Sequence, residues 1–263
     1  MRIIAIANNK GGIGKTTSVV NLGAALAGFE KKTLLIDFDP QANLSKSLGI
    51  RECEKTIYDA LVNEESPAIY PIKSNLDIIP ANLNLTKAEQ QLDPAQGDHH
   101  LLKEILATFN SVYEYVLIDC PPSLNILTTS ALTAATDMLI PVQAEFLALE
   151  GLVTFLDSVK KIKRRINVNL EIAGIFVTRF DQRKVLNRHV IETLESKFPE
   201  MLMSRPVREN IALAEAPVKR TDIFEYAPKS YGAEDYRFLA REIIHKLEAN
   251  SEESQEAEKK VLQ

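Results

Sequence analysis

The sequence Asn9-Lys10-Gly11-Gly12-Ile13-Gly14-Lys15-Thr16-Thr17 decides the fold, because it lies between a short apolar run and a stretch with helical periodicity, SVVNLGAALA. Glycines at positions 11, 12 and 14 permit backbone conformations that direct successive N–H groups at phosphate oxygens. The N-terminus of the following helix adds its partial positive charge. Strand, glycine loop and helix therefore stand in the order that a phosphate-binding loop requires.

The side chains of this loop have separate expected tasks. Lys15 is expected to contact the β- and γ-phosphates of a nucleotide, and the Thr16 hydroxyl to ligate Mg²⁺. The strict pattern has its first glycine where Asn9 stands, and Lys10 adds a second lysine inside the loop. The nucleotide-binding residues expected here are Lys10, Gly11, Gly12, Ile13, Gly14, Lys15, Thr16 and Thr17.

Short apolar runs recur along the rest of the chain, with stretches of helical periodicity between them. Continuous apolar runs suit strands that are covered on both faces, and alternation with helices suits crossovers in a parallel sheet. We therefore predict a doubly wound, mostly parallel α/β sheet flanked by helices in a three-layer sandwich. The expected strands are Ile3–Ala7, Thr33–Ile36, Leu76–Ile79, Tyr115–Ile118, Met138–Val142 and Ile172–Val177. The expected helices are Lys15–Ala27, Leu101–Phe109, Ser123–Ala135, Leu149–Arg165, Lys184–Lys197, Ile211–Ala216 and Ala233–Lys246.

The composition narrows the class of protein. The chain has 263 residues, of which 45% are hydrophobic and 25% charged, which excludes disordered, collagen-like and coiled-coil classes. Its two cysteines are too few for a disulfide scaffold, which predicts a reducing, cytoplasmic compartment. No uncharged apolar run reaches about 18 residues, and no signal-type core follows the N-terminus. We expect one domain over residues 1–249 and an acidic tail over residues 250–263 that is disordered or a frayed helix.

The charge is unevenly distributed. The net charge is −5, yet residues 160–246 hold 18 Lys and Arg against 12 Asp and Glu. A basic third quarter is a weak indication of a surface that binds a polyanion, and ordinary solvated helix surfaces explain it equally well.

The loop Lys-Gly-Gly-Ile-Gly-Lys-Thr-Thr resembles the deviant Walker A box of the ParA/MinD/NifH group of P-loop ATPases, in which the extra lysine is the signature residue. The resemblance implies that ATP and Mg²⁺ bind here. It also implies a nucleotide-sandwich dimer, in which Lys10 reaches the partner's phosphates while Lys15 and Thr16 act within their own subunit.

Two acidic segments resemble further boxes of this group. In Leu34–Gln41, the position of Asp39 implies a carboxylate needed for hydrolysis, and Asp37 a nearby carboxylate that organises the site. Four apolar residues then lead to Asp119, which is expected beside the phosphate loop, near Mg²⁺ or its water shell. The implied catalytic residues are Lys10, Lys15 and Asp39, and the implied metal-site residues are Thr16, Asp37 and Asp119.

The branch of the group depends on segments outside the nucleotide boxes. The two cysteines lie in segments that give little basis for a NifH-type iron–sulfur cluster, and the acidic C-terminus has the wrong sign for a MinD-type membrane helix. Local matches such as Ala148–Leu152 and Pro228–Glu234 resemble ParA/Soj proteins, and NIALAEAP from Asn210 resembles the family's adenine-side loop, so Asn210 is expected to bind nucleotide.

The ParA/Soj resemblance implies a slow switch ATPase in chromosome or plasmid segregation. It implies an ATP-dependent homodimer that binds double-stranded DNA nonspecifically, a ParB/Spo0J-like partner that stimulates hydrolysis, and a cytoplasmic location on the nucleoid. Two alternatives stay open: a MinD-like ATPase that acts at a membrane, and a ParA-like ATPase that positions a protein cargo.

The expected DNA-binding residues are basic positions of the C-terminal part. Many relatives have a Ser-Phe/His-Gly-Lys-Pro run here, whereas this chain has Val218–Asp222, which moves the positive charge to Lys219 and Arg220. The full expected set is Lys219, Arg220, Lys229, Arg241 and Lys246. Ordinary surface charge is the alternative explanation for these residues.

Overall fold

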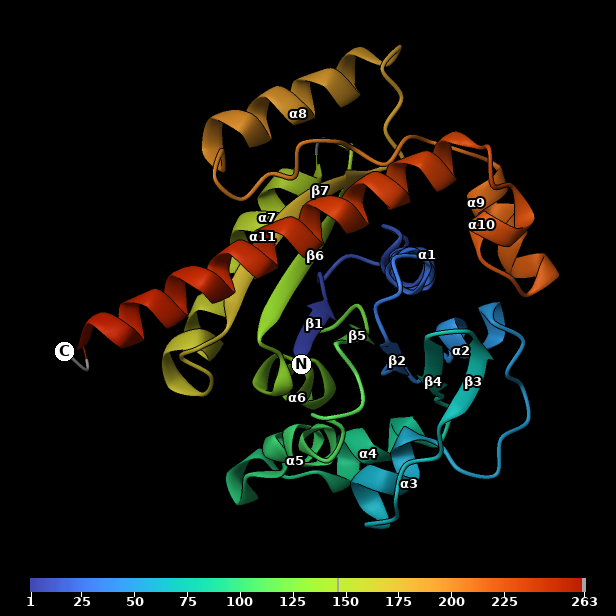
Figure 1. Ribbon diagram of the computed structural model, residues 1–263, viewed down its shortest axis with the longest axis vertical. Helices are drawn as coiled ribbons and strands as arrows, with labels where there is room; N and C mark the ends of the chain where they lie inside the picture. The colour runs from blue at the N-terminus through green and yellow to red at the C-terminus, as the bar shows by residue number, and fades with distance from the viewer. Residues whose placement is uncertain (146, 262–263) are drawn as a thin grey trace.

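The architecture is a seven-stranded sheet between two layers of helices (Figure 1). The computed structural model describes residues 1–145 and 147–261. The strand order is β3-β4-β2-β5-β1-β6-β7, and all neighbours are parallel except β3 and β4. The strands are β1 (Arg2–Ile6), β2 (Thr33–Asp37), β3 (Tyr70–Lys73), β4 (Leu76–Ile79), β5 (Tyr115–Asp119), β6 (Asp137–Gln143) and β7 (Glu171–Thr178).

The helices connect these strands and cover both faces of the sheet. The α-helices are α1 (Lys15–Gly28), α2 (Asn43–Ser47), α3 (Ile57–Val62), α4 (Leu85–Gln91), α5 (Leu101–Ala107), α6 (Ile126–Ala134), α7 (Leu147–Arg165), α8 (Val185–Lys197), α9 (Ala212–Glu215), α10 (Ile223–Tyr226) and α11 (Tyr231–Val261). Three short 3₁₀ helices are η1 (Pro94–Gln96), η2 (Asp98–His100) and η3 (Ala216–Lys219). The predicted doubly wound class is confirmed.

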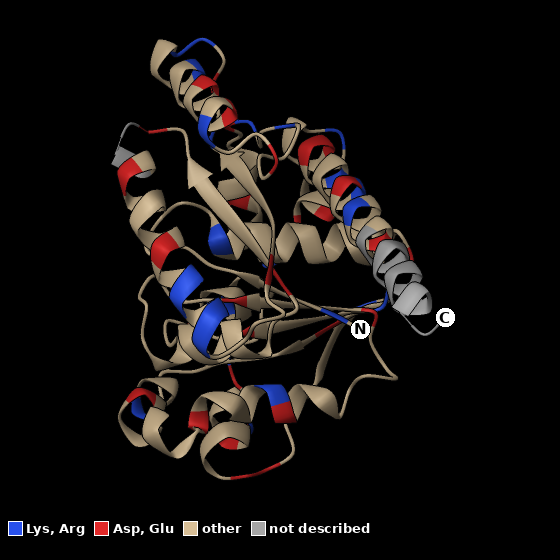
Figure 2. Cartoon of the chain, turned by 90° about the vertical axis from the view of Figure 1, so that its left-hand side faces the viewer, with Lys and Arg blue, Asp and Glu red and all other residues tan. Residues whose placement is uncertain are grey.

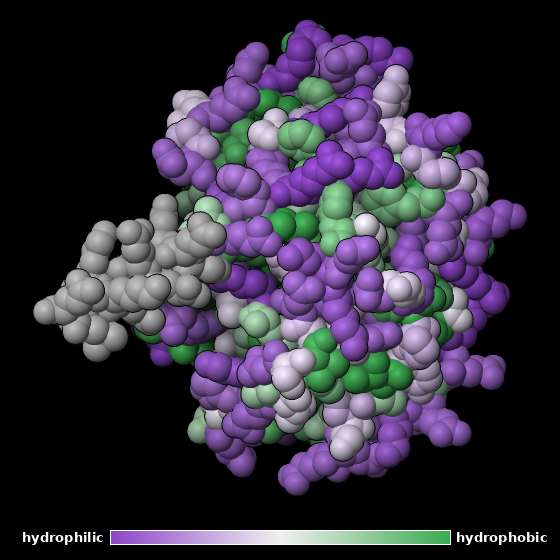
Figure 3. Space-filling model, viewed as in Figure 1, coloured by the Kyte–Doolittle hydropathy of each residue, from purple (hydrophilic) through white to green (hydrophobic). Residues whose placement is uncertain are grey.

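Among the described residues, the core consists of two large hydrophobic clusters, one on each face of the sheet, and a small third cluster around Ile223. Alternate residues of each strand point to opposite faces, so that Leu34 and Ile36 of β2 pack with α3 to α8, while Leu35 packs with α1, α2 and α11. The middle strand β5 and its neighbour β2 are buried along their whole length, as their continuous apolar runs indicate. On the face shown in Figure 3, hydrophilic residues predominate and hydrophobic side chains form small patches between them.

Several element boundaries differ from the sequence-based ones for local reasons. The helix expected from Ser123 begins at Ile126, because the Asn125 side chain accepts a hydrogen bond from the Thr128 N–H and caps the helix there. The helix expected over 211–216 is α9 followed by η3. The last helix, α11, extends to Val261 and therefore crosses the expected boundary at residue 249.

The sequence-based assignment missed β3 and the short helices α2, α3, α4 and α10. Strand β3 contains Pro71, which has no N–H to donate, and the strand lies at the edge of the sheet where this is tolerated. The four helices have seven residues or fewer, too short for a periodicity to be read.

Candidate nucleotide site

The phosphate loop leads from the interior strand β1 into α1, as the sequence predicts. Gly12 and Gly14 have φ angles of +74° and +92°, a region that side chains with a Cβ rarely adopt, so glycine is required at both positions. The Thr178 hydroxyl at the end of β7 donates to the Ile13 carbonyl at 2.8 Å. The loop is thereby fixed at the carboxyl ends of the parallel strands, where ligands of open α/β sheets bind.

Lys15 is the central cation of the loop. Its ammonium group donates to the carbonyl oxygens of Asn8 at 3.2 Å and Lys10 at 2.9 Å, and the residue is only 7% exposed. Burial lowers the pKa of Lys15, while the negative charge of Asp119 is the largest opposing influence. A buried ammonium held by carbonyl oxygens and facing carboxylates is ready to contact an anionic ligand.

Asp37 and Asp119 end the adjacent strands β2 and β5 and are register partners in the sheet. Both residues are buried, and burial raises the pKa of Asp119 well above its usual range, with the neighbouring charge of Asp37 acting in the same direction. A hydrogen bond with the Thr16 side chain opposes this shift. Among the described residues, Asp119 Oδ2 has no hydrogen-bond partner. Two buried carboxylates and the Thr16 hydroxyl form an oxygen-rich position that fits Mg²⁺ or its water shell.

Asp37 is also bound firmly to α2. Its Oδ2 accepts from the Ser45 N–H at 2.8 Å and from the Ser45 hydroxyl at 2.6 Å. Burial raises the pKa of Asp37 to about 6, although the two bonds from Ser45 oppose the shift. Ser45 could not be identified from the sequence, because a single serine eight residues after the carboxylate has no distinctive spacing. These two bonds hold the Asp37 carboxylate against α2, and the predicted role of Asp37 in organising the site would act through them.

Asp39 lies between the buried carboxylate pair and the surface. It is half-buried, and its Oδ1 accepts from the Gln41 N–H at 2.9 Å. Its charge raises the pKa of Lys15 and of Asp119, which places it in the electrostatic environment of both.

Lys10, the second lysine of the loop, makes an ion pair within its own subunit. Its Nζ lies 2.7 Å from Glu145 Oε2, and the two side chains are 37% and 48% exposed. Glu145 follows β6 and was not identified from the sequence. A pair so exposed is weakly bound, so Lys10 can exchange this partner for another anion.

A cavity of about 540 Å³ continues the site from the phosphate loop toward the C-terminal part. Gly12, Thr17 and Asn210 all line it, so Asn210 lies at the same cavity as the phosphate loop. The Asn210 Oδ1 accepts from the Ala212 N–H at 2.9 Å, which orients its amide. Arg179 also lines the cavity and was missed, because an isolated arginine after a strand carries no motif.

Arg208 supports the wall of this cavity. Its guanidinium makes bonds of 2.6 to 3.2 Å to the buried carboxylate of Asp235 and lies 4.1 Å from the centre of the Tyr231 ring. The Arg208 N–H also donates to Asp235 at 2.9 Å. The start of α11 is thereby joined to the segment that carries Asn210.

The residues expected to bind DNA divide into two groups. Lys219, Arg220 and Lys229 are exposed, and among the described residues they have no ion-pair partner. Arg241 instead lies over the Phe29 ring, and the Lys246 ammonium donates to the Glu200 carbonyl. Lys246 is 15 residues beyond the start of α11, or about 22 Å along the helix. One subunit therefore does not gather all five residues into one patch.

Strand order, phosphate loop and paired carboxylates together define a nucleotide-binding protein of the P-loop class. A family model described as "AAA domain" matches residues 1–172. The sporulation initiation inhibitor protein Soj of Bacillus subtilis is 43% identical over 248 residues, 92% of this chain and 98% of that protein. The chromosome partitioning protein ParA of Caulobacter vibrioides is 39% identical over 93% of this chain and 94% of its own length. The chain belongs to the ParA/Soj family of chromosome-partitioning ATPases.

Solved structures show the same fold. Cobyrinic acid a,c-diamide synthase of Mycobacterium smegmatis, solved with ADP and magnesium, has a TM-score of 0.84 and 31% sequence identity, and the match covers 95% of this chain and 96% of that one. That protein therefore binds nucleotide and magnesium on this fold. Within residues 1–145 and 147–261, no helix has the length and apolar character needed to cross a membrane.

Proposed function

We propose that this protein is an ATP-driven switch in the segregation of a chromosome or plasmid. The observation that carries the proposal is the second, exchangeable lysine, Lys10, beside the phosphate loop. It occurs in a chain that matches two proteins named as chromosome-partitioning proteins over 94% and 97% of their lengths. Binding of ATP with Mg²⁺ would close two subunits face to face. The closed dimer would bind double-stranded DNA without sequence preference, in the cytoplasm on the nucleoid.

The described residues take separate tasks in this cycle. Lys15 neutralises the β- and γ-phosphates, and its burial makes that contact strong. Lys10 leaves Glu145 and completes the partner subunit's site. Asp39 orients the attacking water, and Asp37, held by Ser45, fixes α2 beside it. The Mg²⁺ ion, when bound near Thr16 and Asp119, supplies positive charge to the phosphates.

DNA binding rests on the exposed cations Lys219, Arg220 and Lys229. Because they lack acidic partners among the described residues, their charge is available to phosphates of the DNA backbone. Arg241 and Lys246 would join them only in a surface that extends along α11 or across the dimer. A ParB/Spo0J-like partner would stimulate hydrolysis and so release the dimer from DNA.

The decisive experiment measures binding of duplex DNA with no nucleotide, with ADP, and with a slowly hydrolysed ATP analogue, at several salt concentrations. We expect the protein to bind DNA only when the ATP analogue is present, and with little dependence on base sequence. The affinity for DNA should fall steeply with salt concentration, because binding releases counterions. Lys219→Glu, Arg220→Glu and Lys229→Glu should each weaken binding and flatten the salt slope. Lys103→Glu, an exposed lysine on α5, is the matched control and should change little.

Other results would favour the alternatives. An ATP-loaded protein with no affinity for DNA at low salt would contradict the proposal. ATP-dependent co-sedimentation with anionic liposomes would then indicate a membrane-positioning ATPase. If the protein bound neither DNA nor liposomes, an ATPase that positions a protein cargo would be favoured.

A further inference from the structure

A cavity outside the nucleotide site lies among the short helices at the bottom of Figure 1. It has a volume of about 760 Å³ and is lined by α3, the segment 63–67, the end of α4, and α5. That volume is within the usual range for ligand-binding pockets, about 300–1,000 Å³. We refer to it as the α3–α5 groove.

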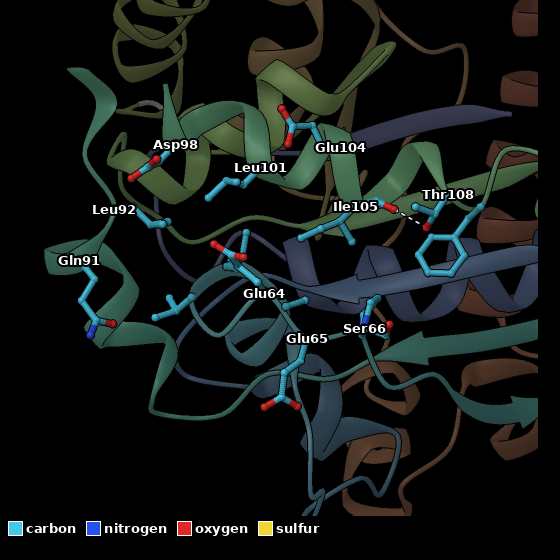
Figure 4. Close-up of a pocket in the computed structure, with 15 residues that line it drawn as sticks. Glu64, Glu65, Ser66, Gln91, Leu92, Asp98, Leu101, Glu104, Ile105 and Thr108 are labelled. Carbon is cyan, nitrogen blue, oxygen red and sulfur yellow. Dashed lines mark hydrogen bonds between the residues drawn. The ribbon is translucent and has the colours of Figure 1, made fainter. Parts of the chain in front are cut away.

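The floor of the α3–α5 groove is apolar. Leu101, Ile105 and Phe109 pack on the core with one side and are only half-buried, so the other side faces the groove. Figure 4 shows Leu92, Leu101 and Ile105 around the same space. Apolar surface that is left open in this way gains free energy when a ligand covers it.

The rim of the groove is acidic. Four carboxylate residues line it: Glu64, Glu65, Asp98 and Glu104. Glu65 pairs with Lys55 at 2.8 Å, and Asp98 accepts from the Asp93 N–H, whereas Glu64 and Glu104 have no partner among the described residues. No Lys or Arg belongs to the described lining. The two free carboxylates are thus available to a cation.

The acidic character extends beyond the rim. Residues 57–109 hold eight Asp and Glu against three Lys and Arg. In Figure 2 the helices at the bottom of the molecule carry more red than blue positions. This charge repels DNA and anionic lipid head groups, so neither polyanion is the occupant.

We propose that the α3–α5 groove binds a basic, amphipathic peptide segment of a partner protein. Apolar side chains of the segment cover Leu101 and Ile105, and its Lys or Arg side chains pair with Glu64 and Glu104. Opposite charges steer such a segment to the groove, and burial of its apolar side chains holds it there. This inference does not depend on the proposed switch cycle.

The position of the groove separates it from the ATPase site. Helices α3 to α5 cover one face of the sheet, whereas α1 and α11 cover the other. A peptide in the groove therefore leaves the phosphate loop and the exposed cations Lys219, Arg220 and Lys229 accessible. We expect its affinity to be equal with ADP and without nucleotide.

The test uses the full chain and a labelled twelve-residue probe of alternating Leu and Lys pairs, Lys-Leu-Leu-Lys repeated three times. Fluorescence anisotropy compares it with two probes of the same length, one with Glu in place of Lys and one with Ser in place of Leu. Wild-type protein should bind the Leu/Lys probe at least about tenfold more tightly than either comparison probe, because each lacks one half of the recognition. Similar affinity for the Lys/Ser probe would overturn the proposal, since it would reveal charge attraction alone.

Charge-reversal variants locate the site. Glu64→Lys and Glu104→Lys should each weaken Leu/Lys binding by about tenfold, since repulsion replaces attraction at the rim. Glu195→Lys, on the exposed surface of α8, adds the same charge outside the groove and should bind as wild type. Equal weakening in all three variants, or in none, would overturn the proposal. Glu64→Gln and Glu104→Gln only remove the charge, so each should weaken binding of the Leu/Lys probe less than the corresponding Lys variant. They provide a second test if a charge-reversal variant fails to fold.

Discussion

The hydroxyl groups of Tyr236 and Ser18 lie 2.9 Å apart in the interior, although 218 residues separate them in the chain. Ser18 follows the phosphate loop in α1, and Tyr236 lies in α11 and also lines the nucleotide cavity. A second buried bond, from the Ile223 N–H to Asn21 Oδ1 at 2.8 Å, joins α10 to the same helix. Through these contacts the phosphate-loop helix supports the segment that carries Lys219, Arg220 and Lys229.

Tyr236→Phe should therefore destabilise the protein. The change leaves the buried Ser18 hydroxyl without its partner, which costs about 1–3 kcal/mol of unfolding free energy. Urea unfolding followed by circular dichroism measures the loss. Tyr58→Phe is the control, because its bond to Gln91 is exposed and its removal should cost less than about 0.5 kcal/mol. Equal losses in the two variants would contradict the structural role of the Tyr236–Ser18 bond.

Lys15→Ala should weaken ATP binding by roughly 10- to 100-fold, since it removes a charge-assisted contact with the phosphates. ATP-dependent dimerisation and DNA binding should fall with it. Isothermal titration with ATP and Mg²⁺ gives the affinity, and Lys103→Ala serves as the control for loss of a lysine. Wild-type affinity in Lys15→Ala would show that the phosphates bind elsewhere.

Lys10→Ala should separate nucleotide binding from dimerisation. The monomer should keep its ATP affinity, whereas sedimentation should show no ATP-dependent dimer and hydrolysis should cease. Glu145→Gln tests the other half of the ion pair: it frees Lys10, so the dimer should form at an equal or lower protein concentration. If Lys10→Ala lost monomer binding as fully as Lys15→Ala, the role across the dimer would be wrong.

Asp39→Ala should trap the ATP-bound state. The change removes the carboxylate that orients water and also relieves its repulsion with the phosphates, so the dimer should form and remain on DNA. Phosphate release should fall to the uncatalysed background. Normal turnover by this variant would remove Asp39 from the hydrolytic step.

Asp37→Asn should stabilise the nucleotide-free protein at neutral pH. Burial raises the pKa of Asp37 from 3.8 to about 6, so folding favours its protonated form. The stability that this protonation contributes is present below pH 4 and is lost as pH rises through 6. The gain from Asn should thus be larger at pH 8 than at pH 5, by on the order of 1 kcal/mol. Urea unfolding at the two pH values measures it, and an equal gain at both would show that Asp37 has an ordinary pKa.

The fold class and the phosphate loop could be predicted because short, consecutive stretches of sequence encode them. The runs ending at Asp37 and Asp119 are apolar throughout because their strands are buried on both faces, and the glycines of the phosphate loop occupy φ angles that demand them. These features are contained in a few consecutive residues, so the fold class and the phosphate loop followed from the sequence.

The partners of the site residues could not be predicted in the same way. Ser45, Glu145 and Tyr236 reach the site from three separate segments, and each is an ordinary polar residue in its own sequence context. Only the tertiary packing of the fold, in which α2 and α11 both contact α1 and β6 pairs with β1, brings them together. For the same reason the sequence-based set grouped Lys246 with Lys219, although Lys219 lies in η3 and Lys246 lies 15 residues along α11.

The position of β1 between β5 and β6 has a consequence for synthesis of the chain on the ribosome. This strand is made before its partners β5 and β6, whose residues lie between 115 and 143. Helix α1, which follows β1, makes its buried contact with Tyr236 only after that residue has been synthesised. A ribosome-bound nascent chain therefore carries an unpaired apolar strand until β5 has been synthesised, and its nucleotide pocket can be completed only after Tyr236 has been added.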